Sequence, residues 1–555
     1  MEPVRNFAAD LSGTVWGWPE AFPVMVAALL LTGLVTTVSL RFLQLRKLKH
    51  GLDVIRGKYD DPSHQGDLSH FRALTTALSA TVGIGNIAGV ATAIHYGGPG
   101  ALFWMWVTAI FGMALKYAEC TLSMKYRQIL PDGTASGGPM YYIEHGLGKN
   151  WKPLAVAFAV CTIISSFGSG NSIQAFTVAD QMRADVGVAT WITGAISAVV
   201  IGAVILGGIT RIGAVTSRLV PYMAAVYVLG GLTVVLINFQ QIPAMVTLIF
   251  ASAFKPAATG WGFAGGTFIF MLTWGVKRGI FSNESGQGSA PIAHAAAKTD
   301  EPVREGVVAM LGPMIDTLII CTITGLVILS TNVWDSKHRE DIPVNAQSDI
   351  TVIDNLAGVS TNGLLDDSVR FSGTLSVVDG LALEAQLVHN HSTIEDPVFL
   401  LDDRPWLGEI PVVDGVIQFD DIPDLMLVGD MALNGSPLTA WAFQKGLQPV
   451  LGKWGYLIVT IGVVLFGIST AISWSYYGDR AVVYLFGPQW IIPYKILFCV
   501  VNFLGAVFSL EIVWNFGDSA LGLMALPNLI ALVLLNKKVR QMTGEYFARE
   551  HTPYR

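Results

Sequence analysis

The ten residues "TVGIGNIAGV", Thr81 to Val90, decide how this chain folds. They lie in a long apolar run, yet they include one polar amide and three glycines: Asn86, Gly83, Gly85 and Gly89. Glycine costs about 1 kcal/mol relative to alanine inside a helix. The stretch therefore predicts an interruption in a segment that otherwise has the composition of a buried helix.

Three explanations compete for this glycine cluster. A dinucleotide-binding loop requires G-x-G-x-x-G between a strand and a helix, but here the third glycine is one residue late and no strand precedes it. A G-x-x-x-G helix contact explains Gly85 and Gly89, but not Gly83 or Asn86. A broken membrane helix explains all four, because an opened backbone needs a ligand, an ion or water as its partner. We favour the broken helix.

The composition places most of the chain in lipid. Of its 555 residues, 52% are hydrophobic and only 14% are charged, whereas soluble domains carry about 25% charged residues. Neither metal-ligand spacing nor a nucleophile–base pair appears, so we expect no enzyme, no cofactor and no nucleic-acid partner. We predict an all-α polytopic membrane protein with about eleven transmembrane helices, near residues 22–41, 71–96, 99–126, 152–182, 187–207, 212–238, 263–285, 304–330, 455–486, 490–511 and 514–536.

Basic residues predict the orientation of these helices. The first apolar stretch is followed by Arg41, Arg46 and Lys47, which indicates that its C-terminal end lies in the cytoplasm. Alternation then puts the N-terminus outside and the C-terminus inside. The other cytoplasmic connections also carry Lys and Arg, whereas the short outer ones are nearly free of them, Lys255 excepted. We therefore expect a multi-pass protein of the plasma membrane, of the bacterial inner-membrane type.

One region, residues 331–436, has no spanning segment. It holds 19 Asp and Glu but four Lys and Arg, a net charge of −15 against −7 for the whole chain. Alternating apolar and polar residues with Asp-Gly turns predict short β-hairpins. We expect a small β-rich extracytoplasmic insert between two transmembrane parts, residues 1–330 and 437–555. We interpret its acidic residues as a solvated surface rather than a cation site, and any protein or cation partner stays open.

A second glycine-rich cluster, "TWGVKRGIFSNESGQGSA", runs from Thr273 to Ala290 in the seventh predicted span. The two clusters lie five spans apart, so spans 2–6 and 7–11 form two five-helix units. Because five is odd, the second unit is inverted relative to the first. Interrupted helices at matching positions of inverted repeats are typical of a transporter's substrate site.

Polar residues in other spans add candidates for binding. Gln174 lies one turn after Asn171 in the fourth span, and two adjacent hydroxyls lie in the ninth, on Ser469 and Thr470. Hydroxyl and carbonyl oxygens suit a hard cation such as Na⁺, although such hydroxyls often bond their own helix instead. Asp316 in the eighth span either carries a proton, offsets the charge of an ion or pairs with a neighbouring donor.

Three stretches together resemble a known family. They are "ALTTALSATVGIGNIAGVATAIHYGGPGALFWMW", "GIFSNESGQGSAPIAHAA" and "STAISWSYYGDRA", and they are similar to the alanine or glycine:cation symporters, also called sodium:alanine symporters. The resemblance covers essentially all the predicted spans and leaves out the acidic insert. It implies a leucine-transporter-like fold, with an extra first helix before two inverted repeats. It also implies Na⁺-coupled uptake of alanine or glycine by alternating access.

The resemblance further implies roles for individual residues. The substrate carboxylate would bind the amides of Ile84 and Gly85, Gln174 would make a polar contact, and Trp274 would limit side-chain size. Asn86 and the Thr81 carbonyl match a second sodium site of the broader group. The full substrate set is Thr81, Gly83, Ile84, Gly85, Asn86, Gln174, Thr273, Trp274 and Gly275, and the Na⁺ set is Ser79, Val82, Phe466, Ser469 and Thr470.

Two alternatives to Na⁺-coupled symport stay open. One is a proton-coupled amino-acid transporter, in which Asp316 would be the group that carries the proton. The other is a receptor or scaffold in which a transporter-like membrane part presents the acidic insert to partners. Accumulation of labelled alanine under an inward Na⁺ gradient distinguishes these functions, because a receptor binds without accumulating.

Overall fold

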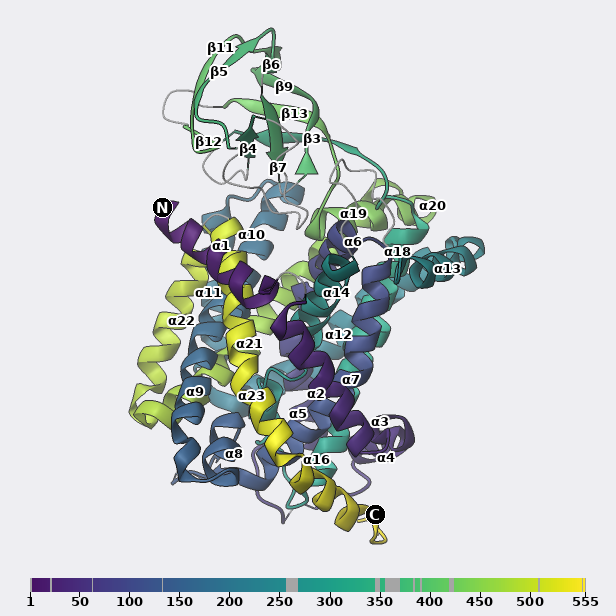
Figure 1. Ribbon diagram of the computed structural model, residues 1–555, viewed down its shortest axis with the longest axis vertical. Helices are drawn as coiled ribbons and strands as arrows, with labels where there is room; N and C mark the ends of the chain where they lie inside the picture. The colour runs from purple at the N-terminus through teal and green to yellow at the C-terminus, as the bar shows by residue number, and fades with distance from the viewer. Residues whose placement is uncertain are drawn as a thin grey trace.

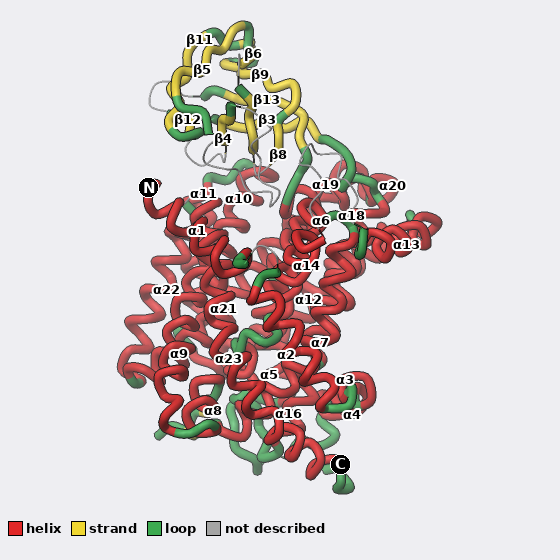
Figure 2. Tube along the Cα trace, viewed as in Figure 1, coloured by secondary structure: helices red, strands yellow, loops and turns green. Residues whose placement is uncertain are grey.

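A computed structural model gives the fold. It describes residues 2–554 except 20–21, 62, 132, 256–267, 345–349, 355–369, 383–384, 390–391, 419–423, 508–509 and 552. An elongated helical bundle carries a β domain at one end, and the C-terminus lies at the other (Figures 1 and 2). We call these the insert end and the opposite end of the bundle.

The helical part precedes and follows the insert. Its first portion contains α1 (Glu2–Gly17), α2 (Val24–Ser39), α3 (Leu43–Arg46), α4 (Leu48–Ile55), α5 (His70–Thr81), η1 (Gly85–Gly89), α6 (Val90–Gly97), α7 (Gly100–Tyr126), α8 (Pro139–Gly146), α9 (Lys152–Phe167), η3 (Gly168–Ser172), α10 (Ile173–Val186), α11 (Thr190–Ile205), α12 (Gly208–Ile237) and α13 (Ile242–Ser252). The chain continues through α14 (Phe268–Asn283), α15 (Ala290–His294), α16 (Pro302–Ala309), α17 (Leu311–Pro313), η5 (Met314–Cys321) and α18 (Thr322–Ser330). After the insert come α19 (Gly435–Gly446), α20 (Gln448–Leu451), α21 (Leu457–Phe486), α22 (Ile491–Gly505) and α23 (Leu510–Phe547).

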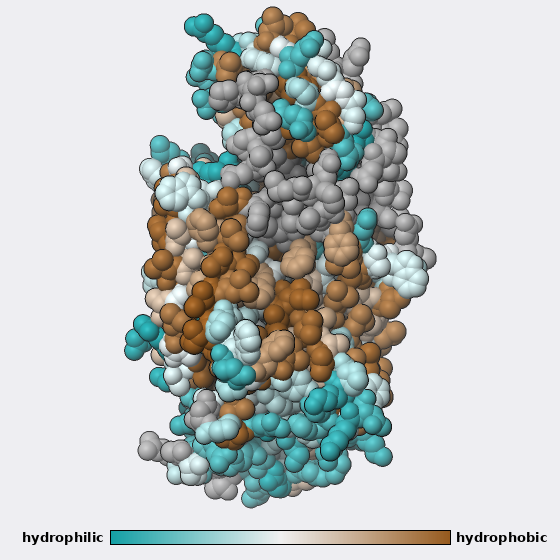
Figure 3. Space-filling view, turned by 90° about the vertical axis from the view of Figure 1, so that its left-hand side faces the viewer, coloured by the Kyte–Doolittle hydropathy of each residue, from teal (hydrophilic) through white to brown (hydrophobic). Residues whose placement is uncertain are grey.

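The prediction of a polytopic helical membrane protein is confirmed at this level. Six helical segments of the described chain are long and apolar enough to cross a membrane, and the bent pair formed by α5 with η1 and α6 makes seven. Other segments predicted to span, such as α2 and α11, are shorter apolar helices of 16 residues. On the face shown in Figure 3, hydrophobic side chains form a band across the middle of the bundle, and the opposite end below it is hydrophilic. Such a band suits contact with the hydrocarbon core of a bilayer.

The second predicted span is a broken helix, as the glycine cluster indicates. The hydroxyl of Ser69 caps α5 by accepting from the amide of Arg72, and α5 ends at Thr81. The chain then bends by 54° between α5 and the segment from Gly85 to Gly97. That second half opens with a π-helical turn, η1, before α6. Wide turns of this kind are frequent at functional sites.

The β-rich insert is present between α18 and α19. Eleven antiparallel strands form one sheet around a separate apolar core that includes Leu387, Phe399 and Leu427. Asp414 and Gly415 join two strands with φ angles of 51° and 76°, which is the left-handed pair that a tight hairpin turn requires. The strands are β3 (His338–Pro343), β4 (Ile350–Ile353), β5 (Gly373–Val378), β6 (Leu381–Ala382), β7 (Gln386–His389), β8 (Ser392–Thr393), β9 (Glu395–Leu401), β10 (Arg404–Pro405), β11 (Gly408–Val413), β12 (Val416–Ile417) and β13 (Met426–Met431).

Candidate functional site

Two interrupted helices face each other in the middle of the bundle. The first interruption lies between α5 and η1. The second lies between α14, which ends at Asn283, and α15, which begins at Ala290. In this second break Glu284, Gly286 and Gly288 have φ angles of 53°, 81° and 85°. A left-handed glutamate is uncommon, and such strain is concentrated at functional sites.

A small cavity lies between the two breaks, and its free space is about 10 Å³. Six of the predicted residues line it: Thr81, Gly83, Ile84, Gly85, Gln174 and Thr470. Six further lining residues were missed by the sequence analysis: Ala80, Ser169, Phe281, Glu284, Trp474 and Leu521. This free space is about what one water molecule needs, so the lining has to move apart before an organic molecule fits.

The first break presents backbone amides to the cavity. Gly85 begins η1, and the leading N–H groups of a helix have no acceptor within that helix. A helix N-terminus of this kind attracts an anionic group. A Cβ on Gly85 would lie 3.0 Å from the Phe281 ring and 3.1 Å from the Cα of Ser282. Glycine is therefore needed here because the two breaks approach each other so closely.

Asn86 stabilises the first break instead of lining the cavity. Its Oδ1 accepts from the amide of Gly83 at 2.9 Å, and its Nδ2 donates to Asp316 Oδ1 at 2.5 Å. The other carboxylate oxygen of Asp316 accepts from the hydroxyls of Ser282 and Thr317, each at 2.7 Å. Asp316 is fully buried. It therefore joins both breaks to η5 through neutral donors.

Four of the five residues predicted to bind Na⁺, all except Val82, come together between α5 and α21. The Ser79 hydroxyl donates to the Ser469 carbonyl at 2.8 Å, and the Thr470 hydroxyl donates to the Ser79 carbonyl at 3.1 Å. The Ser469 hydroxyl also donates to the Phe466 carbonyl at 3.0 Å. All of these side chains are buried. Carbonyl and hydroxyl oxygens from two helices thus converge next to the cavity.

The predicted trio Thr273, Trp274 and Gly275 lies apart from the lining residues. The Trp274 ring stacks on Tyr96 with the ring centroids 4.2 Å apart, nearer the insert end on α14 and α6. The indole that lines the cavity belongs to Trp474 on α21. One signal for it was available in the sequence, because Trp474 follows Thr470 by four residues and so shares its helix face.

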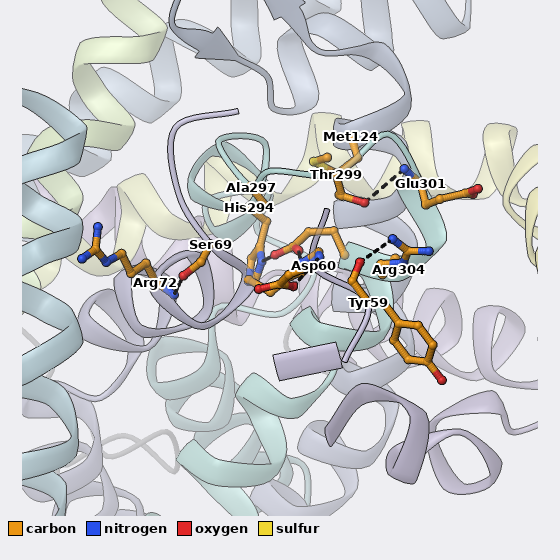
Figure 4. A network of polar contacts seen from close by, with 12 residues as sticks. Tyr59, Asp60, Ser69, Arg72, Met124, His294, Ala297, Thr299, Glu301 and Arg304 are labelled. Atoms are coloured by element: carbon orange, nitrogen blue, oxygen red, sulfur yellow. Dashed lines mark hydrogen bonds and ion pairs between the residues drawn. The ribbon is translucent and has the colours of Figure 1, made fainter. Parts of the chain in front are cut away.

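At the opposite end, buried polar contacts tie α5 to α15 and α16. The Glu305 carboxylate bonds the imidazoles of both His70 and His294, and all three side chains are at most 1% exposed. The guanidinium of Arg127 donates to the carbonyls of Ala297 at 2.7 Å and of three further residues. Figure 4 shows this network from Ser69 and Arg72 to Arg304, which donates to the Tyr59 carbonyl.

At the insert end, α19 closes over the first break. The Thr439 hydroxyl donates to the carbonyl of Ile87 within η1 at 3.1 Å. The insert touches α6, which continues η1: the hydroxyl of Ser392 lies 3.4 Å from the ring nitrogen of His95. The cavity is thus covered from both ends of the bundle.

Comparison with known proteins assigns the family. The sequence model of the sodium:alanine symporter family matches residues 1–360 and 425–554. The chain is 41% identical to the sodium/alanine symporter AgcS of Methanococcus maripaludis, over 96% of this chain and 95% of that protein. It is 31% identical to the putative sodium/proton-dependent alanine carrier protein YrbD of Bacillus subtilis, over 98% of this chain and 92% of that protein. It is also 31% identical to the probable sodium/glutamine symporter GlnT of the same organism, over 98% of this chain and 91% of that protein. The chain therefore belongs to the sodium:alanine symporter family, whose members are membrane transporters and not enzymes.

Proposed function

We propose that this protein couples inward movement of Na⁺ to uptake of a small neutral amino acid, alanine or glycine, by alternating access. The observation that carries the proposal is the set of oxygens from Ser79, Phe466, Ser469 and Thr470, which converge beside the cavity. Na⁺ binding there would bridge α5 and α21. Because linkage is reciprocal, an ion that favours substrate binding is itself bound more tightly when substrate is present.

The substrate would bind with its carboxylate at the start of η1. The amides of Ile84 and Gly85 lie where a helix N-terminus meets the cavity. A small cavity favours a small side chain, and the Trp474 indole supplies one wall. AgcS and YrbD are both named as carriers of alanine, which supports the same choice of substrate.

The transport cycle rests on the two broken helices. We assign spans 2–6 and 7–11 to two inverted repeats, with the insert end outside the cell and the opposite end in the cytoplasm. In this cycle one group of helices rocks against the other, so that the contacts at the two ends open in turn. Lys and Arg concentrate on the connections of the opposite end, in agreement with this orientation.

Proton coupling is the second candidate, and Asp316 is the observation that favours it. A fully buried carboxylate at membrane depth is a functional candidate by default. If protons drive uptake, a pH gradient alone will accumulate alanine, and Asp316→Asn will abolish that accumulation.

Uptake into proteoliposomes tests the proposed function. Under an inward Na⁺ gradient the wild type should accumulate labelled alanine. Thr470→Ala should lower the apparent Na⁺ affinity roughly tenfold or more, because it removes an oxygen that would contact the ion. Ser475→Ala is the matched control, since within the described chain its hydroxyl bonds only the Ile472 carbonyl of the same helix. An unchanged Na⁺ affinity in Thr470→Ala would refute the assigned ion site.

A further inference from the structure

Glu284 is the one ionisable residue among those that line the cavity. It is 2% exposed and directly follows α14, in the second break. Its backbone is held in the left-handed region at φ 53°. A glutamate in that conformation is strained, and such strain is concentrated at functional sites.

The Glu284 carboxylate has only neutral hydrogen-bond donors around it. Oε1 accepts from the Trp474 indole N–H at 2.8 Å, and Oε2 accepts from the Ser289 hydroxyl at 2.6 Å. The buried Lys116 Nζ makes no hydrogen bond within the described chain, but its charge is close enough to act on this carboxylate. Each carboxylate oxygen can accept more than one bond. The cavity wall therefore offers a buried carboxyl group with spare acceptor capacity.

Gln174 supplies a second acceptor in the same cavity. Its side chain is 3% exposed, and its Nε2 donates to the Ser169 carbonyl at 3.0 Å. Its Oε1 has no partner in the described chain, and it would lie 3.6 Å from a Cβ placed on Gly83. A buried, unpartnered carbonyl oxygen beside the first break needs a donor from a ligand.

An amino acid brings an ammonium group as well as a carboxylate. With its carboxylate at η1, a bound amino acid has to place its ammonium inside the same small cavity. A desolvated ammonium is strongly disfavoured unless it meets hydrogen-bond acceptors or an opposite charge. The lining hydroxyls, on Thr81, Ser169 and Thr470, each donate to a backbone carbonyl and are neutral, so Glu284 is the lining group that can supply an opposite charge.

We propose that Glu284, together with Gln174 Oε1, receives the substrate ammonium, so that the site selects a zwitterion over a monocarboxylate of equal size. This inference rests on the proposed function and specifies the recognition of its substrate. The same carboxylate holds the Trp474 indole, which packs so closely on η3 that a Cβ on Gly170 would lie 2.6 Å from the Trp474 Cβ. Glu284 thereby links ammonium recognition to the position of one cavity wall.

Ligand binding to the purified full-length protein tests this inference independently of transport. The probes are alanine and propionate, which has the same carbon skeleton without the ammonium, titrated at fixed Na⁺ by ligand-induced thermal shift. The wild type should prefer alanine at least roughly 30-fold, the value that about 2 kcal/mol for a buried charge pair implies. Glu284→Gln keeps the shape and should lower that preference at least roughly tenfold, by weakening alanine and not propionate.

Trp474→Phe separates the two roles of the carboxylate. It keeps an aromatic ring in the wall, but it removes the N–H that donates to Glu284 and makes the ring smaller. We expect the preference for alanine over propionate to survive in this variant. Equal weakening of both probes in Glu284→Gln, unchanged alanine binding, or the same loss in Trp474→Phe would each overturn the inference.

The proposed function can fail separately from this inference. If the wild type binds alanine with a Glu284-dependent preference but accumulates none under a Na⁺ gradient, the transport proposal fails and the assignment of Glu284 stands. If uptake depends on Na⁺ but Glu284→Gln leaves the preference unchanged, only the assignment of Glu284 fails. Absence of alanine binding to the wild type would overturn both.

Discussion

The two ends of the bundle close the cavity with different chemistry. At the opposite end, Glu305 bonds two buried histidines, and the backbone amides of Asp67 and Leu68 both donate to the Ala296 carbonyl. At the insert end, one hydroxyl bond from Thr439 to η1 accompanies apolar packing of α19. The opposite end is thus closed by charged groups and backbone bonds, whereas the insert end is closed mainly by a packed helix.

This difference bears on how each end opens. Charged and polar groups released into water regain hydrogen bonds there, so an opened polar contact is compensated by hydration. Apolar surface that is exposed to water costs about 25 cal/mol per Å² and is not compensated. We therefore expect the opposite end to open into water, and α19 to shift while staying in contact with apolar surface.

The largest effect should follow Glu305→Ala. The substitution leaves two buried imidazoles without their shared acceptor, and breaking a buried charged contact costs about 3–5 kcal/mol. We expect a marked fall in the thermal unfolding midpoint of the purified protein. Asp300→Asn is the control, because that carboxylate is 63% exposed at the same end. Equal midpoints for the two variants would show that the buried carboxylate contributes nothing to this closure.

Arg127→Lys should have the next largest effect. The planar guanidinium reaches four carbonyls at 2.7–3.0 Å, which a single ammonium cannot reproduce. We expect a loss of about 2 kcal/mol, measured by thermal unfolding. Lys125→Arg, at an exposed position two residues earlier in the last turn of α7, should change nothing. An unchanged unfolding midpoint in Arg127→Lys would mean that the carbonyls are held by the backbone alone.

At the insert end, Thr439→Val should have a smaller effect of about 1 kcal/mol. It removes the donor to the Ile87 carbonyl while it keeps the volume of the side chain. Hydrogen exchange at η1 measures the result, and protection of the amides there should fall. Thr439→Ser keeps the hydroxyl and should preserve protection. If valine and serine behave alike, α19 holds the break by packing alone.

The smallest effect concerns Glu340 on β3. Burial, and then Asp341 and Asp185, raise its pKa from 4.5 to about 7, and His338 lies 3.7 Å away. The folded state then holds the proton more tightly than the unfolded state, so stability falls as the pH rises from about 4.5 to 7. Glu340→Gln should flatten this dependence, with a higher unfolding midpoint than the wild type at pH 8 and a similar one at pH 5. A parallel pH profile in both proteins would contradict it.

The sequence predicts the breaks and the insert well because each has a local signal. Glycines with Asn86 mark the first break, and Asp-Gly turns mark the hairpins. The cavity wall was predicted less well, because which side chain faces inward depends on helix rotation and tilt. Trp274 and Trp474 both follow polar membrane residues, but only Trp474 lines the cavity. Glu284 was missed as a lining residue because its left-handed backbone depends on tertiary contacts.

The place of the insert has a practical consequence for protein engineering. The family model skips residues 361–424, which hold β5 to β12 of the sheet, but it includes β3, β4 and β13. The helices α18 and α19 flank the insert as ordinary helices of the bundle. The chain between these helices therefore accommodates an inserted domain with its own core, as surface loops tolerate domain insertion. A compact fluorescent protein exchanged for the sheet would report on movement of α19 from a position that the chain already uses to carry a domain.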